Sequence, residues 1–567
     1  MMEWSYEADI VVIGSGAAGL PAAIRACEAG ASVILVEVQP HLGGHAICSG
    51  GNVPLGGGTS AQKKYGIADS SDLLFQDLTD WSIVQPNGSA DYRYNDREIV
   101  RAFADNNVAA FDWLLDHGVV FADQAPDERG GVSVGNSAPR EMHAVPLDYP
   151  IAHTGLPVEE AFRSTYSSGA GLIYPLIAAA ERAGVQILLE HRMTAIHREK
   201  ANSGEVLGVA VQHLEQRLNI RARKAVIIGT GGSIGNVEFR RMFDPRLTEE
   251  YCGLAGMPWS DQDASGEIAA MGIGASLWGL ANQAAENGYA VTKAGKIGCR
   301  YGYQQLQWEP HSKVFDKAGA VGLRVRDWQN VVLVNMLGRR FYDETGGGFT
   351  ANNFGFVSDY IPHSHRNVQN VTFKPNDFLN AAMAGIGDGH NGGGPIWAIF
   401  DSEAVAREKW IPEAPYVDAA QGFFFKASSL AELAGKIRMK HQRLPMPPEE
   451  LEATIERYNG FVAGGLDEDF GKPRPQYPIL KPPFYAAWAT PVPHDTRAGL
   501  RINAHCEVMD MQGQPIPGLY CAGESAGGFN QHGLARCLVQ GLIAGQHAAD
   551  RVQGRCKDLA PLSASLQ

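Results

Sequence analysis

The chain has 567 residues, 45% of them hydrophobic and 19% charged, which is typical of a globular protein with large buried cores. Its formal net charge of −14 opposes nucleic acid and anionic membrane surfaces as partners. The eight cysteines show neither CxxC nor CxxCH spacing, so the sequence predicts no zinc site, iron–sulfur cluster, attached haem or disulfide framework.

The first predicted strand begins near residue 9, which leaves no room for a signal peptide. The longer apolar stretches are interrupted by glycine or by charge, so none of them predicts a membrane span. We therefore expect a cytoplasmic protein.

Residues 9 to 37, DIVVIGSGAAGLPAAIRACEAGASVILVE, carry the strongest signal in the chain. An apolar strand leads into a glycine turn, an alanine-rich helix, a second apolar strand and a terminal acid. Such a turn presents backbone N–H groups and a helix N-terminus to a pyrophosphate, and the acid accepts from ribose hydroxyls. The segment predicts a dinucleotide site, the alternative being a turn that serves only helix–strand packing. The candidate binding residues are Gly14, Gly16, Ala17, Ala18, Gly19 and Glu37.

Residues 41 to 59, HLGGHAICSGGNVPLGGGT, are glycine-rich and follow this unit directly. Backbone of this kind passes close beneath a flat ligand and offers N–H groups to it, which favours FAD as the nucleotide. The candidate binding residues in this loop are Gly43, Gly44, Ser49, Gly50 and Gly51.

Two later segments have the pattern of buried strands, and we expect both strands to end at the same dinucleotide site. Residues 224 to 236, KAVIIGTGGSIGN, end in glycines that include Gly231, and residues 513 to 524, GQPIPGLYCAGE, end in Gly523 and Glu524. Because strands for one site occur at both ends of the chain, the FAD domain must be assembled from distant segments. The stretch between them contains no nucleotide motif, is richer in proline and charge, and predicts a polar helix over residues 448 to 463.

These motifs resemble the fumarate reductase and succinate dehydrogenase flavoprotein superfamily, which also contains 3-ketosteroid dehydrogenases, urocanate reductase and tricarballylate dehydrogenase. The resemblance spans roughly residues 7 to 550. It implies an α/β fold in which a Rossmann-like FAD-binding domain, built from discontinuous segments, carries an inserted α+β capping domain. The predicted boundaries are residues 1–310 and 484–567 for the FAD-binding domain and 311–483 for the capping domain.

The resemblance also implies an anchor for a substrate carbonyl or carboxylate. The segment HDTRAG (494 to 499) is similar to the family's His-x-Thr-x-Gly-Gly, which places His494 at the substrate. The segment GLARCLVQG (533 to 541) stands where the family has a substrate-binding arginine, here Arg536. The alternatives are a hydrogen-bonded loop histidine and a structural salt bridge.

One family feature is missing. The segment NMLGRRFYDE (335 to 344) matches the family's Gly-x-Arg-Phe-x-x-Glu, but the proton-shuttling arginine of fumarate reductases, eight residues after the position of Arg340, is replaced by Gly348. The fumarate proton relay therefore cannot be transferred to this chain, which argues against simple fumarate reduction.

The proton must then be moved by another group. In QWEPHS (307 to 312), Glu309 stands where the family has a histidine and His311 follows two residues later. Burial could give Glu309 a suitable pKa, and a salt bridge to a nearby arginine is the alternative reading. Other candidates in flanking segments are Tyr303, Tyr342 and Tyr360.

The resemblance implies a soluble FAD-dependent oxidoreductase that forms or reduces a carbon–carbon double bond next to a carboxylate or ketone, by hydride transfer at flavin N5. The missing arginine favours dehydrogenation. The substrate is expected to be a small carboxylic acid or an enone, and a bulky enone would make the enzyme similar to the ketosteroid branch. Without a second dinucleotide motif, electrons must exchange with an external donor or acceptor.

Two other functions stay open from the sequence. A flavin-dependent hydroxylase or oxidase would share the N-terminal fold, and a flavoprotein electron-transfer subunit would have no turnover of its own. Covalent attachment of the flavin through His45 is a further possibility, with a non-covalent FAD as the expectation, because the spacing from His45 to Gly50 is one residue shorter than in the membrane-bound succinate dehydrogenases.

Overall fold

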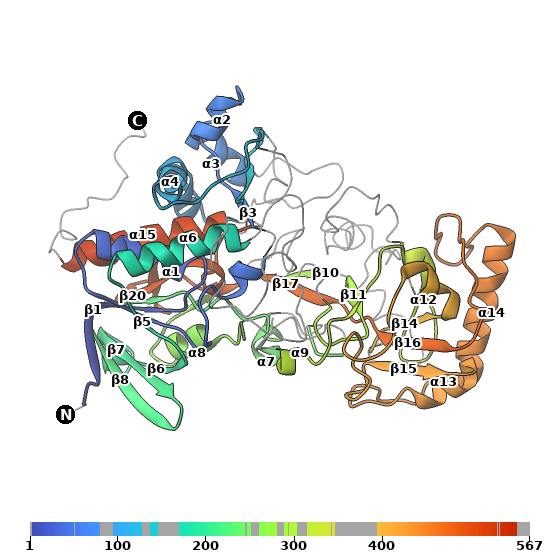
Figure 1. Cartoon of the computed structure of the whole chain (residues 1–567). Helices are drawn as coiled ribbons and strands as arrows, with labels where there is room; N and C mark the ends of the chain where they lie inside the picture. The colour runs from blue at the N-terminus through green and yellow to red at the C-terminus, as the bar shows by residue number, and fades with distance from the viewer. Residues whose placement is uncertain are drawn as a thin grey trace.

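An eight-stranded sheet joins the N-terminal half of the chain to its C-terminal end (Figure 1). Its main path runs β19, β20, β8, β1, β2, β5. These strands span Glu507–Met509, Pro515–Cys521, Gln216–Ile228, Tyr6–Ile13, Val33–Val36 and Gln186–Leu188, in that order. The computed structural model describes residues 3–49, 51–79, 95–126, 137–145, 169–243, 247–250, 260–279, 289–292, 294–302, 315–341, 343–345, 394–529, 531 and 533–552.

The centre of this sheet is parallel and buried. β1 pairs in parallel with β2 and with β8, and β8 pairs in parallel with β20. β2 is buried along its whole length, as expected for a parallel strand that is covered on both faces. The pairing of β20 with β8 confirms that the domain is assembled from distant segments.

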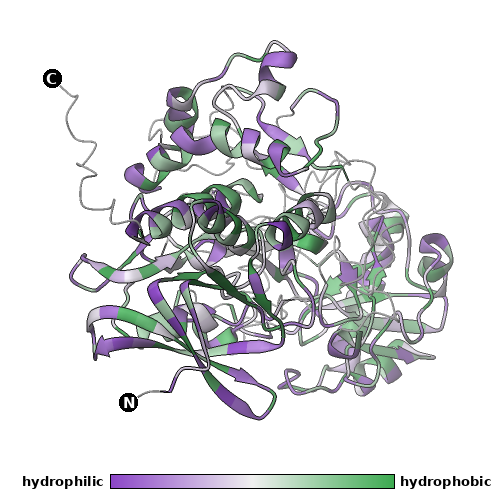
Figure 2. Ribbon diagram, turned by 60° about the vertical axis from the view of Figure 1, so that its left-hand side comes forward, coloured by the Kyte–Doolittle hydropathy of each residue, from purple (hydrophilic) through white to green (hydrophobic). Residues whose placement is uncertain are grey.

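Different layers cover the two faces of the sheet (Figure 1). Helices α1 (Gly19–Glu28), α6 (Gly169–Arg182) and α15 (Ala535–Val552) lie on one face. β6 (His191–Lys200) and β7 (Ser203–His213) form an antiparallel ribbon with β8 on the other. In Figure 2 the centre of the large sheet is hydrophobic, whereas the ribbon carries many hydrophilic residues.

Helices α1 and α15 approach each other closely because small residues line their contact. A Cβ added to Gly541 would lie 2.3 Å from the carbonyl oxygen of Ala18, and one added to Gly545 would lie 2.4 Å from that of Ala22. Any side chain at either glycine would therefore force the helices apart.

A small helical unit packs above α15 in Figure 1. It contains α2 (Ser60–Lys64), α3 (Ser71–Thr79), α4 (Arg97–Asp116) and the short strands β3 (Asn52–Pro54) and β4 (Glu141–His143). The buried Arg140 guanidinium joins its parts by donating to Asp69 at 2.9 Å and to Asp77 at 2.5 Å.

A second, antiparallel sheet organises the middle of the chain, in the order β13, β14, β16, β15. The strands span Val332–Val334, Trp397–Phe400, Phe484–Trp488 and Phe424–Ala427. Helices α12 (Ser402–Glu408), α13 (Leu430–Lys436) and α14 (Pro448–Gly464) pack around it. Separate apolar cores fill its two faces. The chain thus carries an inserted α+β unit, as predicted.

The predicted helix over residues 448 to 463 is confirmed as α14. It begins with Pro448, whose missing N–H costs nothing at a first helical position, and it ends at Gly465 with φ +74°. The predicted domain boundaries stay a prediction. Since β16 pairs with β14 and β15, we propose that the inserted unit includes β16 and ends after residue 489 rather than at 483.

Short elements lie in and between the two bodies. They are α7 (Val237–Arg240), α8 (Ser265–Met271), β9 (Leu277–Trp278), β10 (Tyr289–Thr292), β11 (Lys296–Ile297), α9 (Phe315–Ala318), β12 (Leu323–Arg324), β17 (Val492–Thr496) and β18 (Gly499–Leu500). β10 pairs with β17 and β9 pairs with β18. None of the described helices is long and apolar enough to span a bilayer. Within the same residues, no cluster of three or more metal-ligating side chains occurs. The cytoplasmic location stays a prediction.

A buried ion cluster fixes the inserted unit. Arg340 donates to Glu344 and to Asp467 at 2.8 Å each, and Lys472 lies 3.2 Å from Glu344. Burial raises the pKa of the Glu344 carboxyl, but Arg340 and Lys472 outweigh it and bring the pKa down to about 2. All four side chains are almost inaccessible to solvent, so the charges depend on one another.

Replacing Arg340 by methionine should cost about 3 to 5 kcal/mol of unfolding free energy, because it leaves Glu344 and Asp467 buried without their main cation. Denaturant unfolding measures the loss. Arg339→Met is the matched control: Arg339 is next in the chain, but its pair with Glu450 is partly exposed, and its removal should cost far less. Equal losses in the two variants would contradict this account.

Candidate dinucleotide site

A cavity opens where four parallel strands end. β1, β2, β8 and β20 end at Ile13, Val36, Ile228 and Cys521, and the residues that follow each strand line the cavity. It contains about 1260 Å³ of empty space, part of it open to solvent. The carboxyl edge of a parallel sheet is where α/β proteins bind their ligands.

The three glycines of the first turn differ in how much space the protein leaves for a side chain. Gly14 has φ +96°, and a Cβ there would lie 2.3 Å from the Gly229 carbonyl oxygen. A Cβ on Gly19 would lie 1.8 Å from the Gly14 oxygen. A Cβ on Gly16, in contrast, meets nothing closer than the Gly43 oxygen at 3.9 Å. Protein packing requires the first and third glycines, whereas the second lines the cavity and has room for a side chain within the protein.

The N-terminus of α1 faces this cavity without a side-chain cap. Its N-cap residue is Ala18, which offers no hydrogen-bonding side chain to the first amides of the helix. Ala17 and Ala18 both line the cavity. Uncapped amides and the positive end of the helix dipole suit an anionic pyrophosphate.

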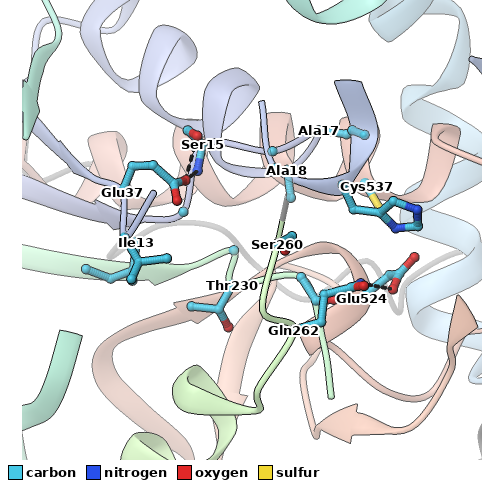
Figure 3. A pocket seen from close by; sticks show the side chains of 18 of the residues that line it. Ile13, Ser15, Ala17, Ala18, Glu37, Thr230, Ser260, Gln262, Glu524 and Cys537 are labelled. Atoms are coloured by element: carbon cyan, nitrogen blue, oxygen red, sulfur yellow. Dashed lines mark hydrogen bonds between the residues drawn. The ribbon is translucent and has the colours of Figure 1, made fainter. Parts of the chain in front are cut away.

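Glu37 connects the turn to the second strand (Figure 3). Its carboxylate accepts from the Ser15 amide at 3.0 Å, the Ser15 hydroxyl at 2.6 Å and the Gln39 amide at 2.9 Å. Ser15 Oγ in turn accepts from the Gly43 amide at 3.0 Å. Burial raises the pKa of Glu37, which is only 5% exposed, while these donors oppose the shift. The acid therefore fixes the glycine turn, and its contact with a ribose stays a prediction.

Thr230, Gln262 and Glu524 form the opposite wall (Figure 3). The Gln262 side-chain amide donates to the Gly231 carbonyl at 2.7 Å and to Glu524 at 3.4 Å. The Thr496 amide also donates to Glu524 at 3.4 Å. The wall thus ties β8, the loop before α8 and the end of β20 together.

A buried acid, Glu267 of α8, lies behind this wall. Burial raises the pKa of its carboxyl to about 8 and the charge of Asp263 adds to the shift, while the Thr230 and Ser525 hydroxyls oppose it. The folded chain therefore holds this proton more tightly than the unfolded chain does. Stability from this group is lost as the pH rises from about 4.5 to about 8, so ionised Glu267 is unfavourable in the folded protein.

The structure places ten of the predicted cofactor residues on the cavity surface. They are Gly14, Gly16, Ala17, Ala18, Glu37, Gly44, Ser49, Gly51, Gly231 and Glu524, and His45 joins them. Three others support the surface from behind: Gly19 against Gly14, Gly43 on Ser15, and Gly523 against Ala18. Gly50 lies outside the described residues. Their binding roles stay predictions.

One part of the cavity surface carries no sequence motif. His191, Arg192 and Met193 of β6 and the loop from residue 260 to 265 also line it. Arg192 holds that loop through ion pairs with Asp261 and Asp263. Neither segment has a nucleotide motif, so only the three-dimensional arrangement could show them.

Arg536, the predicted substrate anchor, is 2% exposed. Its guanidinium donates to the Phe529 carbonyl at 2.5 Å and to the Thr496 carbonyl at 3.0 Å. No described acid forms an ion pair with it, and its Nε atom has no hydrogen-bond partner among the described residues. The bond to Thr496 brings Arg536 close to the segment that contains His494, whose side chain lies outside the described residues. The binding roles of Arg536 and His494 stay predictions.

The predicted proton-transfer residues cannot be placed in this way. Glu309 and His311 lie outside the described residues, as do Tyr303, Tyr342 and Tyr360. Their roles stay predictions.

Comparison with known proteins identifies the class of this site. The model of the FAD binding domain family matches residues 9–536. The chain is 27% identical over 558 residues to an NADH:fumarate oxidoreductase of Klebsiella pneumoniae, covering 96% of this chain but 48% of that protein, so it spans about half the length of that relative. It is 26% identical over 596 residues to a 3-oxosteroid 1-dehydrogenase of Mycolicibacterium smegmatis, covering 91% of each chain.

Two solved structures share the fold. The 3-ketosteroid Δ1-dehydrogenase of Sterolibacterium denitrificans superimposes with a TM-score of 0.61 at 19% identity and covers 96% of this chain and 100% of that one. The open conformation of a flavocytochrome c3 fumarate reductase gives 0.60 at 23% identity and covers 96% and 79%. These matches confirm the predicted α/β fold, and the family match confirms FAD as the cofactor.

Gly16→Val should give a folded but colourless protein. The valine side chain would project into the cavity and would not collide with protein atoms. FAD would therefore be excluded while the chain packs normally. The visible absorption of the purified protein and its melting temperature measure the two effects. Gly19→Ala is the contrasting variant, since its Cβ collides with the Gly14 carbonyl and should lower stability itself. Full FAD content in Gly16→Val would refute the assignment.

Proposed function

Because this chain belongs to the FAD binding domain family and is an FAD-dependent oxidoreductase acting on carbon–carbon bonds, we propose that its substrate carries a carboxylate beside the reacting bond. We propose further that it works as a dehydrogenase. The observation that supports a substrate carboxylate is the buried positive charge of Arg536.

A buried guanidinium is costly unless an anion compensates it. Arg536 has two carbonyl partners, Phe529 and Thr496, but no described acid. Carbonyl groups satisfy N–H donors without neutralising the charge. A substrate carboxylate would do both, and its charge-assisted hydrogen bonds are about twice as strong as those to a neutral ketone.

Bound FAD supplies hydride transfer at its N5 atom. The chain itself must hold the carboxylate and move a proton to or from the neighbouring carbon. We assign the first task to Arg536 with His494, and the second to Glu309, with His311 and the three tyrosines as the other candidates. Gly348 in place of an arginine supports dehydrogenation over fumarate reduction.

We propose that the flavin exchanges electrons with a partner outside this chain. We propose a protein, a quinone, dioxygen or a freely docking small carrier, because a second dinucleotide motif is absent from the sequence. A ketone substrate is the second candidate, because the alignment with a 3-oxosteroid 1-dehydrogenase covers 91% of this chain and 91% of that protein.

A panel of saturated substrates tests the proposal. Under anaerobic conditions, a short-chain carboxylic acid with a CH–CH bond beside its carboxylate should bleach the flavin absorption. The corresponding amide, which lacks the charge, should react far more slowly. Bleaching by 3-oxosteroids but by none of the acids would replace the carboxylate proposal with the ketone one.

Arg536→Met should lower kcat/KM for the acid by about 2 to 4 kcal/mol of transition-state free energy, with the FAD content unchanged. Arg551→Met is the matched control, because Arg551 lies on the same helix and pairs with Glu205 near the surface. Its turnover should equal that of the wild type. Wild-type turnover in Arg536→Met would remove this arginine from the mechanism.

A further inference from the structure

Glu267 is a carboxyl group that the oxidoreductase chemistry does not use. It is fully buried in α8, and neither of its oxygens completes a hydrogen bond with a described residue. No described cation forms an ion pair with it. A buried, unpaired acid lowers stability, so a polar or apolar replacement of the same size would suit the fold better.

The position of Glu267 connects it to the FAD cavity. The hydroxyls of Thr230 and Ser525 act on its carboxyl, and they lie 2.9 Å from each other. Ser525 Oγ also accepts from the Gly232 amide at 3.1 Å. Thr230 lines the cavity, and its hydroxyl is turned to α8, since a Cβ on Gly266 would lie 2.4 Å from it. The acid therefore stands behind the turn at 230–232 that faces the cofactor.

Other ionisable groups on the surrounding elements are already committed. On β6, which packs against α8, these groups are His191, Arg192, His197 and Arg198, besides the exposed Glu199 and Lys200, while β18 contains no ionisable residue. Further ionisable groups are Asp263 before α8, Cys521 of β20 and Glu524 of η4 (Gly523–Ser525). The first four groups of β6 bond to Leu189, to Asp261 and Asp263, to Asn219, and to the carbonyls of Gly204 and Ile273, respectively. Asp263 and Cys521 supply no positive charge. Ionised Glu267 would thus face acids and a thiol rather than a cation.

FAD adds two further negative charges to this region through its pyrophosphate. In a buried site of low dielectric constant, an ionised Glu267 behind the Thr230 wall would repel that dianion. A protonated Glu267 removes the repulsion and can donate a hydrogen bond to the Thr230–Ser525 hydroxyl pair.

We propose that Glu267 is a positioning residue whose neutral acid form holds the turn at 230–232, so that FAD and one proton bind this protein cooperatively. The proposal depends on FAD binding and is independent of which substrate the enzyme uses. By linkage, bound FAD favours the proton on Glu267, and the proton favours FAD to the same extent.

The dissociation constant of FAD from the reconstituted apoprotein, followed by flavin fluorescence from about pH 6 to about pH 10, tests this proposal. In the wild type it should be constant at low pH and rise by about tenfold per pH unit above the titration of Glu267, near pH 8. Glu267→Gln keeps the size and the donor but cannot ionise, so its dissociation constant should stay near the low-pH value throughout.

Two controls separate this effect from others. Glu37→Gln alters the proposed ribose contact and should weaken FAD binding at every pH while keeping the slope above pH 8. The infrared spectrum of the wild-type holoenzyme should contain the carbonyl band of a protonated carboxylic acid, and this measurement on the wild type alone is informative even if a variant folds poorly. Folded Glu267→Gln holoenzyme should lack the band. A flat wild-type profile, the same slope in Glu267→Gln, or no such infrared band would overturn the proposal.

Discussion

The pairing of β8 with both β1 and β20 is the constraint on which the rest of the structure depends. It joins segments that are separated by more than 200 residues and brings the ends of four strands to one edge. The backbone between residues 229 and 232 and the glycine turn at 14 to 19 can approach each other only because this sheet fixes both. The sheet therefore determines where the cavity forms, because it sets the positions of the loops that line it.

The cavity walls are acidic although the cofactor is an anion. Glu37, Glu524, Asp261 and Asp263 all line it, and Arg192 is the arginine among its described lining residues. Attraction for the pyrophosphate must then come from backbone amides and the dipole of α1, whose strength depends on exact positions rather than on net charge. The second glycine of the turn leaves space for the pyrophosphate, and in our proposal the neutral acid form of Glu267 adds no charge that would repel it.

The sequence predicted what local chemistry specifies. The glycine turn, Glu37, the strand that ends at Glu524 and helix α14 all carry their signals in a few adjacent residues, and each lies where it was expected. The role of β6 and of the loop at 260–265 could not be predicted, because they reach the cavity through sheet topology and the Arg192 ion pairs. Glu267 shows the same limit: only its complete burial in the folded chain raises the pKa of its carboxyl, and no adjacent residue signals this. The end of the inserted unit stays a prediction, and the pairing of β16 with both β14 and β15 is the reason for our proposal that the unit includes this strand.

The glycine contact between α15 and α1 has a consequence for how such an enzyme can change. α15 carries Arg536 in its first turn, and α1 presents its first amides to the cofactor, so the close contact at Gly541 and Gly545 holds the two binding ends in fixed alignment. The inserted unit, with its own cores and its own ion cluster, takes no part in this alignment. Insertions and exchanges in that unit can therefore accumulate while the distance between Arg536 and the first amides of α1 stays the same.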